Sequence, residues 1–180
     1  MKQNFDKAFK LTVGAEGGYT ADRKDKGNWT GGRIGVGELK GTKYGISAAS
    51  FPDLDIKNLT LDQSKAIYRR DYWNAIMADQ LPDGVDLIVF DAAVNHGVKE
   101  ASRMLQFAVV PQYIDGTIGP MTIKAAASKP ARDTIKEIAA RRHLLWGNLS
   151  TFSTYGLGWS RRGVDSLVAS LDHLNGRSEE

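Results

Sequence analysis

The 180-residue sequence predicts a mainly α fold with a glycine-rich loop or small β-hairpin. Apolar residues recur at helical spacing in most segments, and seven glycines gather in one stretch, residues 27–45. Amphipathic helices need an apolar residue every three or four positions, whereas clustered glycines interrupt regular structure. We therefore expect helices on both sides of this stretch. Within it we expect an extended loop or a short β element, with a possible hairpin over residues 33–39.

The first two helices are predicted from their N-terminal residues. Asn4 is a residue type that caps helices, and it precedes an amphipathic pattern that runs from Phe5 to about Glu16. Thr60 and Gln63 have the spacing of a capping box, in which each side chain bonds to the backbone of the other residue. This pair predicts a second helix, from Thr60 to about residue 75.

The later helices follow from apolar runs and their breakers. Residues 85–94 are apolar on nearly every side and predict the central buried helix. Pro120 is suited to the first turn of a helix, and Gly176 to the position just after the last one. The remaining helices are expected over 98–109, 120–128, 131–148 and 160–175.

Composition narrows the classes of protein. The chain has no cysteine, so disulfides and cysteine-based zinc sites are excluded. The net charge is +3, but no run of five basic residues occurs, so we expect no nucleic-acid partner. The arginine pairs 141–142 and 161–162 predict a basic surface that would attract an anionic polymer. The first residues lack an apolar core, so we expect cytoplasmic synthesis without a signal peptide and no stable membrane insertion.

Glu16 is the strongest candidate for a catalytic residue. On a helix that continues from Phe5, its side chain shares the apolar face, where burial disfavours the charged form. The negative end of the helix acts in the same direction, so we expect a raised pKa and a protonated acid. Two glycines and Tyr19 follow directly, and the bare backbone would allow close approach. The alternative is a solvated surface glutamate paired with a basic residue.

The sequence lacks the patterns of other common active sites. The glycines do not match a dinucleotide or phosphate loop, the histidines are far apart, and no serine elbow is present. Carboxylate chemistry remains, so we expect neither a cofactor nor a metal. It commonly uses a second carboxylate, and Asp25, nine residues after Glu16, is the best candidate, with Asp22 as the alternative. Both aspartates could equally be loop-forming residues.

Four aromatic rings and one amide are candidates for binding a sugar chain, because flat rings stack on pyranose faces. Trp29 lies in the glycine-rich loop, where a core role is hard to argue. Trp73 could equally be an ordinary core residue, and Asn95 ends the central helix with an amide to spare. The full set is Tyr19, Trp29, Tyr44, Trp73 and Asn95.

Several motifs, taken together and in order, resemble glycoside hydrolase family 108. They are Glu16-Gly17-Gly18-Tyr19, Asp25 with Gly27, Thr42-Lys43-Tyr44-Gly45-Ile46-Ser47, residues 67–73, residues 90–97, Gln106, residues 115–122 and residues 158–162. No single motif is decisive, but their order is specific. The members are lysozyme-like N-acetylmuramidases (endolysins) found largely in phages and prophages.

The resemblance implies a lysozyme-like helical fold and assigns the catalytic acid to Glu16. It also implies an aspartate and a threonine downstream. Asp25 has the fitting separation. Thr42 fits the Thr-x-Tyr-Gly-Ile pattern and is preferred, whereas Thr30 fits simple counting. Residues 1–90 would form the catalytic region. Residues 91–176 would form the peptidoglycan-binding C-terminal region, packed with the first as one globule.

The implied activity is cleavage of the β-1,4 bond between N-acetylmuramic acid and N-acetylglucosamine in bacterial peptidoglycan. We accordingly expect a monomer that reaches the cell wall after release and lyses the host. The rival interpretations are a non-catalytic peptidoglycan-binding or virion structural protein on the same scaffold, a chitinase-like hydrolase, and, least favoured, a nucleic-acid-binding helical protein.

Overall fold

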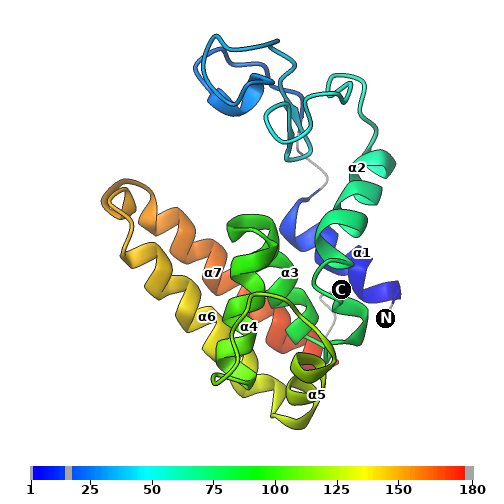
Figure 1. The fold of residues 1–180 in the computed structure, drawn as a ribbon, viewed down its shortest axis with the longest axis vertical. Coiled ribbons are helices and arrows are strands. Elements are labelled where there is room, and N and C mark those ends of the chain that lie inside the picture. Colours follow the sequence, from blue (N-terminus) through cyan, green and yellow to red (C-terminus); the bar gives the residue numbers. More distant parts are fainter. Residues whose placement is uncertain (1, 15–17, 177–180) are drawn as a thin grey trace. The chain divides into compact units, whose positions relative to one another are not determined.

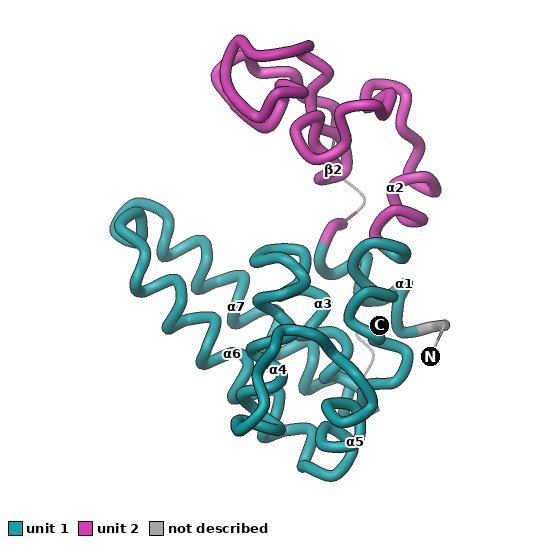
Figure 2. The backbone as a smooth tube through the Cα atoms, viewed as in Figure 1, with its two compact units in different colours: residues 1–12, 69–180 teal, residues 13–68 magenta. Residues whose placement is uncertain are grey.

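The computed structural model describes residues 2–14 and 18–176, with only the backbone described at residues 2 and 3. Two compact units are present: residues 1–12 with 69–180, and residues 13–68 (Figure 2). The chain passes between the two units at residues 12/13 and 68/69. The expected division near residue 90 into a catalytic and a peptidoglycan-binding region stays a prediction. The predicted mainly α fold is confirmed (Figure 1).

The larger unit is helical throughout. Its elements are α1 (Lys2–Thr12), a π-helical turn (Arg69–Trp73), a 3₁₀ turn (Ala78–Gln80), α3 (Val85–His96), α4 (Val98–Val109), α5 (Pro120–Ser128), α6 (Ala131–Gly147) and α7 (Phe152–Leu174). The predicted central helix is α3, which is buried along its first nine residues and packs against α1, α4, α6 and α7. Within the described residues, no helix is long and apolar enough to cross a membrane.

The smaller unit is mostly loop. It contains a 3₁₀ turn (Lys26–Asn28), β1 (Thr42–Lys43), β2 (Ile46–Ser47) and α2 (Leu61–Tyr68). The two strands pair in antiparallel fashion, Thr42 opposite Ser47 and Lys43 opposite Ile46. The turn between them has positive φ at both central residues, Tyr44 (50°) and Gly45 (75°), as in a type I′ hairpin turn.

The predicted hairpin over residues 33–39 is wrong. Residues 33–37 form turns and bends, and the end of the stretch bonds to the preceding segment: Leu39 bridges to Trp29, and the Glu38 carbonyl accepts from the Thr30 N–H. The alternation of small and apolar residues suggested strands, but positive φ angles at Gly35 and Gly37 turn the backbone twice within it. The small β element lies farther along, at residues 42–47.

The first helix differs from its prediction at both ends. Helix α1 ends at Thr12, and Gly14 follows with φ 71°, the left-handed conformation typical of a residue just past a helix. The expected helix through Glu16 is therefore wrong, and Glu16 itself lies outside the described residues. Asn4 lies inside α1 and does not cap it. Its amide donates to Asp83 at 2.9 Å and to Asp86 at 2.8 Å, which ties α1 to the start of α3.

The other helix boundaries follow local signals where these are strong. The capping box is confirmed: Gln63 accepts from the Thr60 N–H at 2.9 Å, and Thr60 Oγ1 accepts from the Gln63 N–H at 3.2 Å. Helix α2 ends at Tyr68, earlier than expected.

Helix α7 begins at Phe152, eight residues before the predicted start, because Gly156 accommodates the Phe152 ring inside the helix. A Cβ at Gly156 would lie 2.8 Å from that ring.

A buried ion-pair network joins four helices of the larger unit. Asp91 on α3 is only 5% exposed, and its two carboxylate oxygens accept from Arg142 on α6 at 2.6 Å and from Arg162 on α7 at 2.8 Å. Arg162 also donates to the backbone carbonyl of Thr12 at 3.1 Å, and Arg142 donates to Ser166 at 3.2 Å. Arg142 is fully buried, so its expected place on a basic surface is wrong.

We expect Asp91→Asn to lower the free energy of unfolding by about 3–5 kcal/mol, because it leaves the Arg142 guanidinium buried without a counter-charge. Chemical denaturation measures this loss. The exposed Asp133→Asn is the matched control and should change stability by less than about 0.5 kcal/mol. The double variant Asp91→Leu with Arg142→Met should recover part of the loss. A loss below about 1 kcal/mol for Asp91→Asn would contradict this account.

Candidate functional site

The loop that follows Glu16 is held together by a buried asparagine in the smaller unit. Asn28 is fully buried; its side-chain oxygen accepts from Thr42 Oγ1 at 2.7 Å, and its amide donates to the Asp22 carbonyl at 3.0 Å. The backbones of Thr20 and Thr42 exchange two hydrogen bonds, at 2.9 and 2.8 Å. These bonds bring Thr42 and the segment from Asp22 to Asn28 into one rigid cluster.

Asp25 belongs to this cluster as a capping residue. Its Oδ1 accepts from the Gly27 N–H at 2.8 Å and caps the 3₁₀ turn Lys26–Asn28, while the side chain remains exposed. Asp22 forms a similar local bond with the N–H of Lys24 at 2.9 Å. Both aspartates therefore have the loop-forming role, and a catalytic role for Asp25 stays a prediction.

The two candidate threonines have different surroundings. Thr42 donates to Asn28 within the cluster, as described above. Thr30 Oγ1 accepts from the Glu38 N–H at 2.8 Å, and a Cβ at Gly37 would lie 2.2 Å from that oxygen. Thr30 therefore fastens the glycine-rich loop, whereas Thr42 adjoins the capped aspartate segment.

Tyr19 lies on an open surface of the smaller unit. Its ring is 40% exposed and packs on Gly41, where a Cβ would lie 2.6 Å from it. Tyr19 lines a pocket of about 360 Å³, together with Leu39, Lys40 and residues 53–57. An exposed ring beside polar side chains is compatible with stacking on a sugar.

The other two aromatic candidates of this unit, Trp29 and Tyr44, form hydrogen bonds within the smaller unit. Trp29 is half-buried, and its indole N–H donates to the Arg23 carbonyl at 3.0 Å. The Tyr44 carbonyl accepts from the Tyr68 hydroxyl at 3.2 Å, and the Lys43 ammonium lies 5.4 Å from the centre of the Tyr44 ring. Sugar binding by Trp29 and Tyr44 stays a prediction.

Trp73 and Asn95 belong to the larger unit. Trp73 is fully buried and packs edge-on against Phe5 and Phe90, at ring distances of 5.4 and 5.5 Å. No face of its ring is open to a sugar, so its predicted binding role is corrected to a core role. Asn95 is exposed at the end of α3, where its amide donates to the Asp91 carbonyl at 2.6 Å.

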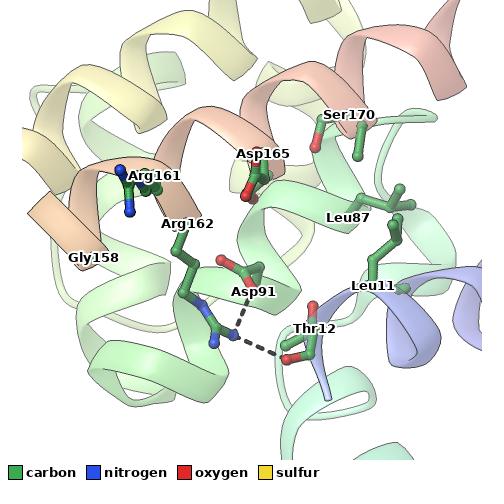
Figure 3. Close-up of a pocket in the computed structure, with 12 residues that line it drawn as sticks. Leu11, Thr12, Leu87, Asp91, Gly158, Arg161, Arg162, Asp165 and Ser170 are labelled. Carbon is green, nitrogen blue, oxygen red and sulfur yellow. Dashed lines mark hydrogen bonds and ion pairs between the residues drawn. The ribbon is translucent and has the colours of Figure 1, made fainter. Parts of the chain in front are cut away.

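The sequence reasoning missed a pocket of about 430 Å³ in the larger unit (Figure 3). Its walls come from the C-terminal half of α1, the middle of α3 and the face of α7 from Gly158 to Ser170. Arg162 crosses it and bonds to Asp91 and to the Thr12 carbonyl. The paired arginines 161 and 162 were the available signal, but only the fold shows that they border a cavity.

One group of described residues has the chemistry of a metal site. Ligand atoms of Asp83, Asp86 and His173 all lie within 4.8 Å of one another. The Lys7 ammonium lies 3.3 Å from His173 Nδ1, and Asn4 donates to both carboxylates. These donors bond to the two carboxylates and to His173 Nδ1, whereas the buried His173 Nε2 has no hydrogen-bond partner among the described residues. Burial raises the pKa of Asp86 to about 6, despite the Asn4 hydrogen bond.

We expect Asn28→Ala to loosen the loop by about 1–3 kcal/mol, because Thr42 Oγ1 and the Asp22 carbonyl lose their partner. Amide hydrogen exchange at Thr20 and Thr42 should accelerate accordingly. Asn58→Ala removes an exposed side chain that bonds to Asp55 and serves as the matched control. Unchanged exchange at both threonines in Asn28→Ala would show that the buried asparagine does not hold the loop.

We expect Asp86 to lower stability as the pH rises. Its folded-state pKa is about 6 against 3.8 for the ordinary group, so its favourable contribution is complete below pH 4 and lost by about pH 7. The difference in free energy of unfolding between the wild type and Asp86→Asn should therefore shift by about 2–3 kcal/mol between pH 4 and 7, in favour of the variant. Denaturation at both pH values measures this shift.

The exposed Asp53→Asn provides the control and should show no such pH-dependent difference. A difference between wild type and Asp86→Asn that is independent of pH would contradict the raised pKa.

A mainly helical fold with a glycine-rich loop and a small two-stranded sheet, in a sequence that contains a Glu-Gly-Gly-Tyr motif, is typical of a lysozyme-like glycoside hydrolase. The sequence profile of the Glycosyl hydrolase 108 family matches residues 9–97. Nine chains of solved structures match. One of them, Brucella abortus SagA, has a TM-score of 0.81 and 32% sequence identity over 97% of each chain.

The chain therefore belongs to the glycosyl hydrolase 108 family, and the predicted lysozyme-like fold and family resemblance are confirmed. No protein among the curated sequences matches it. The family match includes Glu16, Asp25, Thr42 and Tyr19, all within residues 9–97.

Proposed function

We propose that this glycoside hydrolase is a muramidase of the endolysin type, which cleaves the β-1,4 bond between N-acetylmuramic acid and N-acetylglucosamine. The observation that carries the proposal is the order of Glu16, Asp25 and Thr42 within the family match, with the last two held in one cluster by Asn28. A hydrolase that acts through carboxylates needs such fixed groups beside its acid.

In the proposed reaction, Glu16 donates its proton to the glycosidic oxygen as the bond to the leaving sugar breaks. Asp25 and Thr42 stabilise the positively charged sugar ring or orient the attacking water. The water oxygen becomes bonded to the anomeric carbon, and the proton that this water loses passes to a carboxylate, either Asp25 or the ionised Glu16. Two protein features support these roles: Asp25 keeps an exposed carboxylate, and Thr42 is fixed by both its backbone and its hydroxyl.

The raised pKa expected for Glu16 needs a different source from the one the sequence suggested. Helix α1 ends four residues before it, so neither the apolar face nor the end of that helix applies directly. The two glycines and Tyr19 that follow it remain the local features that favour close approach of a substrate.

The proposed partner is bacterial peptidoglycan, acted on by a monomer that reaches the wall after release and lyses the host cell. Binding without catalysis is the second candidate, because the same scaffold could bind a glycan through Tyr19 and its neighbouring pocket alone. The hydrolase needs a catalytic carboxylic acid and the binding protein does not, so this residue distinguishes the two candidate functions.

We expect Glu16→Gln to lower the rate of peptidoglycan clearing by at least about 100-fold, because the amide cannot donate the required proton. Turbidity loss of purified peptidoglycan measures the rate. Glu38→Gln changes an exposed glutamate of the glycine-rich loop and serves as the matched control, with wild-type activity expected. Equal clearing by Glu16→Gln and the wild type would show that another residue is the catalytic acid. Binding to peptidoglycan without clearing by the wild type would favour the binding protein.

A further inference from the structure

The pocket of the larger unit combines an apolar wall with a charged one. Figure 3 shows Leu11 and Leu87 on one side, and Arg161, Arg162 and Asp165 on the other. Leu11 is 48% exposed and gives the wall its open apolar surface, whereas Leu87 behind it is buried. A volume of about 430 Å³ lies within the range of small-molecule sites.

Two oppositely charged side chains of this pocket do not pair with each other. Arg161 and Asp165 are one helical turn apart on α7, a spacing at which such pairs commonly form. Within the described part of the chain, neither has a hydrogen bond or an ion pair. The pocket therefore presents a guanidinium and a carboxylate from side chains whose Cβ atoms are about 5–6 Å apart.

One buried residue that lines the pocket has a polar group without a partner among the described residues. Ser170 is 1% exposed, lines the pocket, and its hydroxyl has no hydrogen bond. A buried hydroxyl without a partner is unfavourable, and a ligand group that bonds to it would remove this penalty. The Asp91 carboxylate, in contrast, accepts hydrogen bonds at both oxygens, from Arg142 and from Arg162, and forms a fixed part of the wall.

We propose that this pocket binds the zwitterionic end of a diamino acid in the wall peptide, an α-amino acid group such as that of meso-diaminopimelate. The carboxylate of the ligand pairs with Arg161, its ammonium pairs with Asp165, and its alkyl stem covers Leu11 and Leu87. This inference rests on the proposed function, which supplies peptidoglycan as substrate. It adds a specificity for the peptide to the cleavage of the glycan.

The test compares two soluble probes on the full-length protein by calorimetry. One is a disaccharide tripeptide that ends in meso-diaminopimelate, and the other is the same molecule with L-lysine, which keeps the ammonium but lacks the carboxylate. We expect the first to bind at least about tenfold more tightly. Arg161→Gln should remove this preference, whereas Asp165→Asn should weaken both probes about tenfold, because both carry the ammonium.

Arg132→Gln and Asp133→Asn change exposed residues of α6 outside the pocket and should leave both affinities unchanged. Equal affinity for the two probes, no binding of either, or an equal effect of Arg161→Gln on both would overturn the proposal. Clearing of peptide-free glycan strands by the same preparation tests the proposed function separately. If the protein clears the glycan strands but binds both probes equally, only the pocket proposal is contradicted. If it prefers the diaminopimelate probe but does not clear the strands, only the proposed muramidase activity is contradicted.

Discussion

The larger unit depends on one buried carboxylate shared by two arginines. Asp91 lies on the central helix, and its partners Arg142 and Arg162 lie on the two longest helices. Arg162 extends the network to the Thr12 carbonyl, which the end of α1 leaves without a helical partner. Charges removed from water are costly unless each is paired, so this network specifies one arrangement of four helices. It also forms the rigid wall of the pocket that borders α1 and α7.

In the smaller unit, a buried side chain with hydrogen-bonded partners also fixes the structure, but its groups are neutral. Asn28 links two loop segments, residues 22–25 and 40–42, through its side chain and its backbone. The Asn28 carbonyl accepts from both Lys40 and Gly41, which are followed at once by Thr42. The protein therefore has two buried polar centres, one that orders the helices of the larger unit and one that orders the loop carrying Asp25 and Thr42.

The bounds of a helix were predicted correctly where a glycine or proline in the sequence marks its start. Helix α4 begins after Gly97 and α5 begins at Pro120, and both match their predicted bounds. The start of α7 was missed because Gly156 and Gly158 resemble loop residues in sequence, although Gly156 packs against a ring. The end of α1 was misplaced because Val13 and Glu16 continue its apolar pattern, whereas Gly14 ends the helix.

The sequence predicts which residues belong to the candidate site, but not the contacts that hold them in place. Glu16, Asp25 and Thr42 follow from a motif and its spacing, but the residue that fixes two loop segments, Asn28, looks like an ordinary turn residue in a glycine-rich stretch. The partners of Asp91 lie 51 and 71 residues away, beyond any local pattern. Trp73 shows the reverse case, since its aromatic ring suggested binding but its packing places it in the core.

The most direct test of the proposed activity is the identity of the new reducing end in digested peptidoglycan. Borohydride reduction followed by mass spectrometry distinguishes the two amino sugars. A muramidase releases fragments that end in reduced N-acetylmuramic acid. Fragments that end in reduced N-acetylglucosamine would show that the enzyme cleaves the other glycosidic bond and would contradict the account.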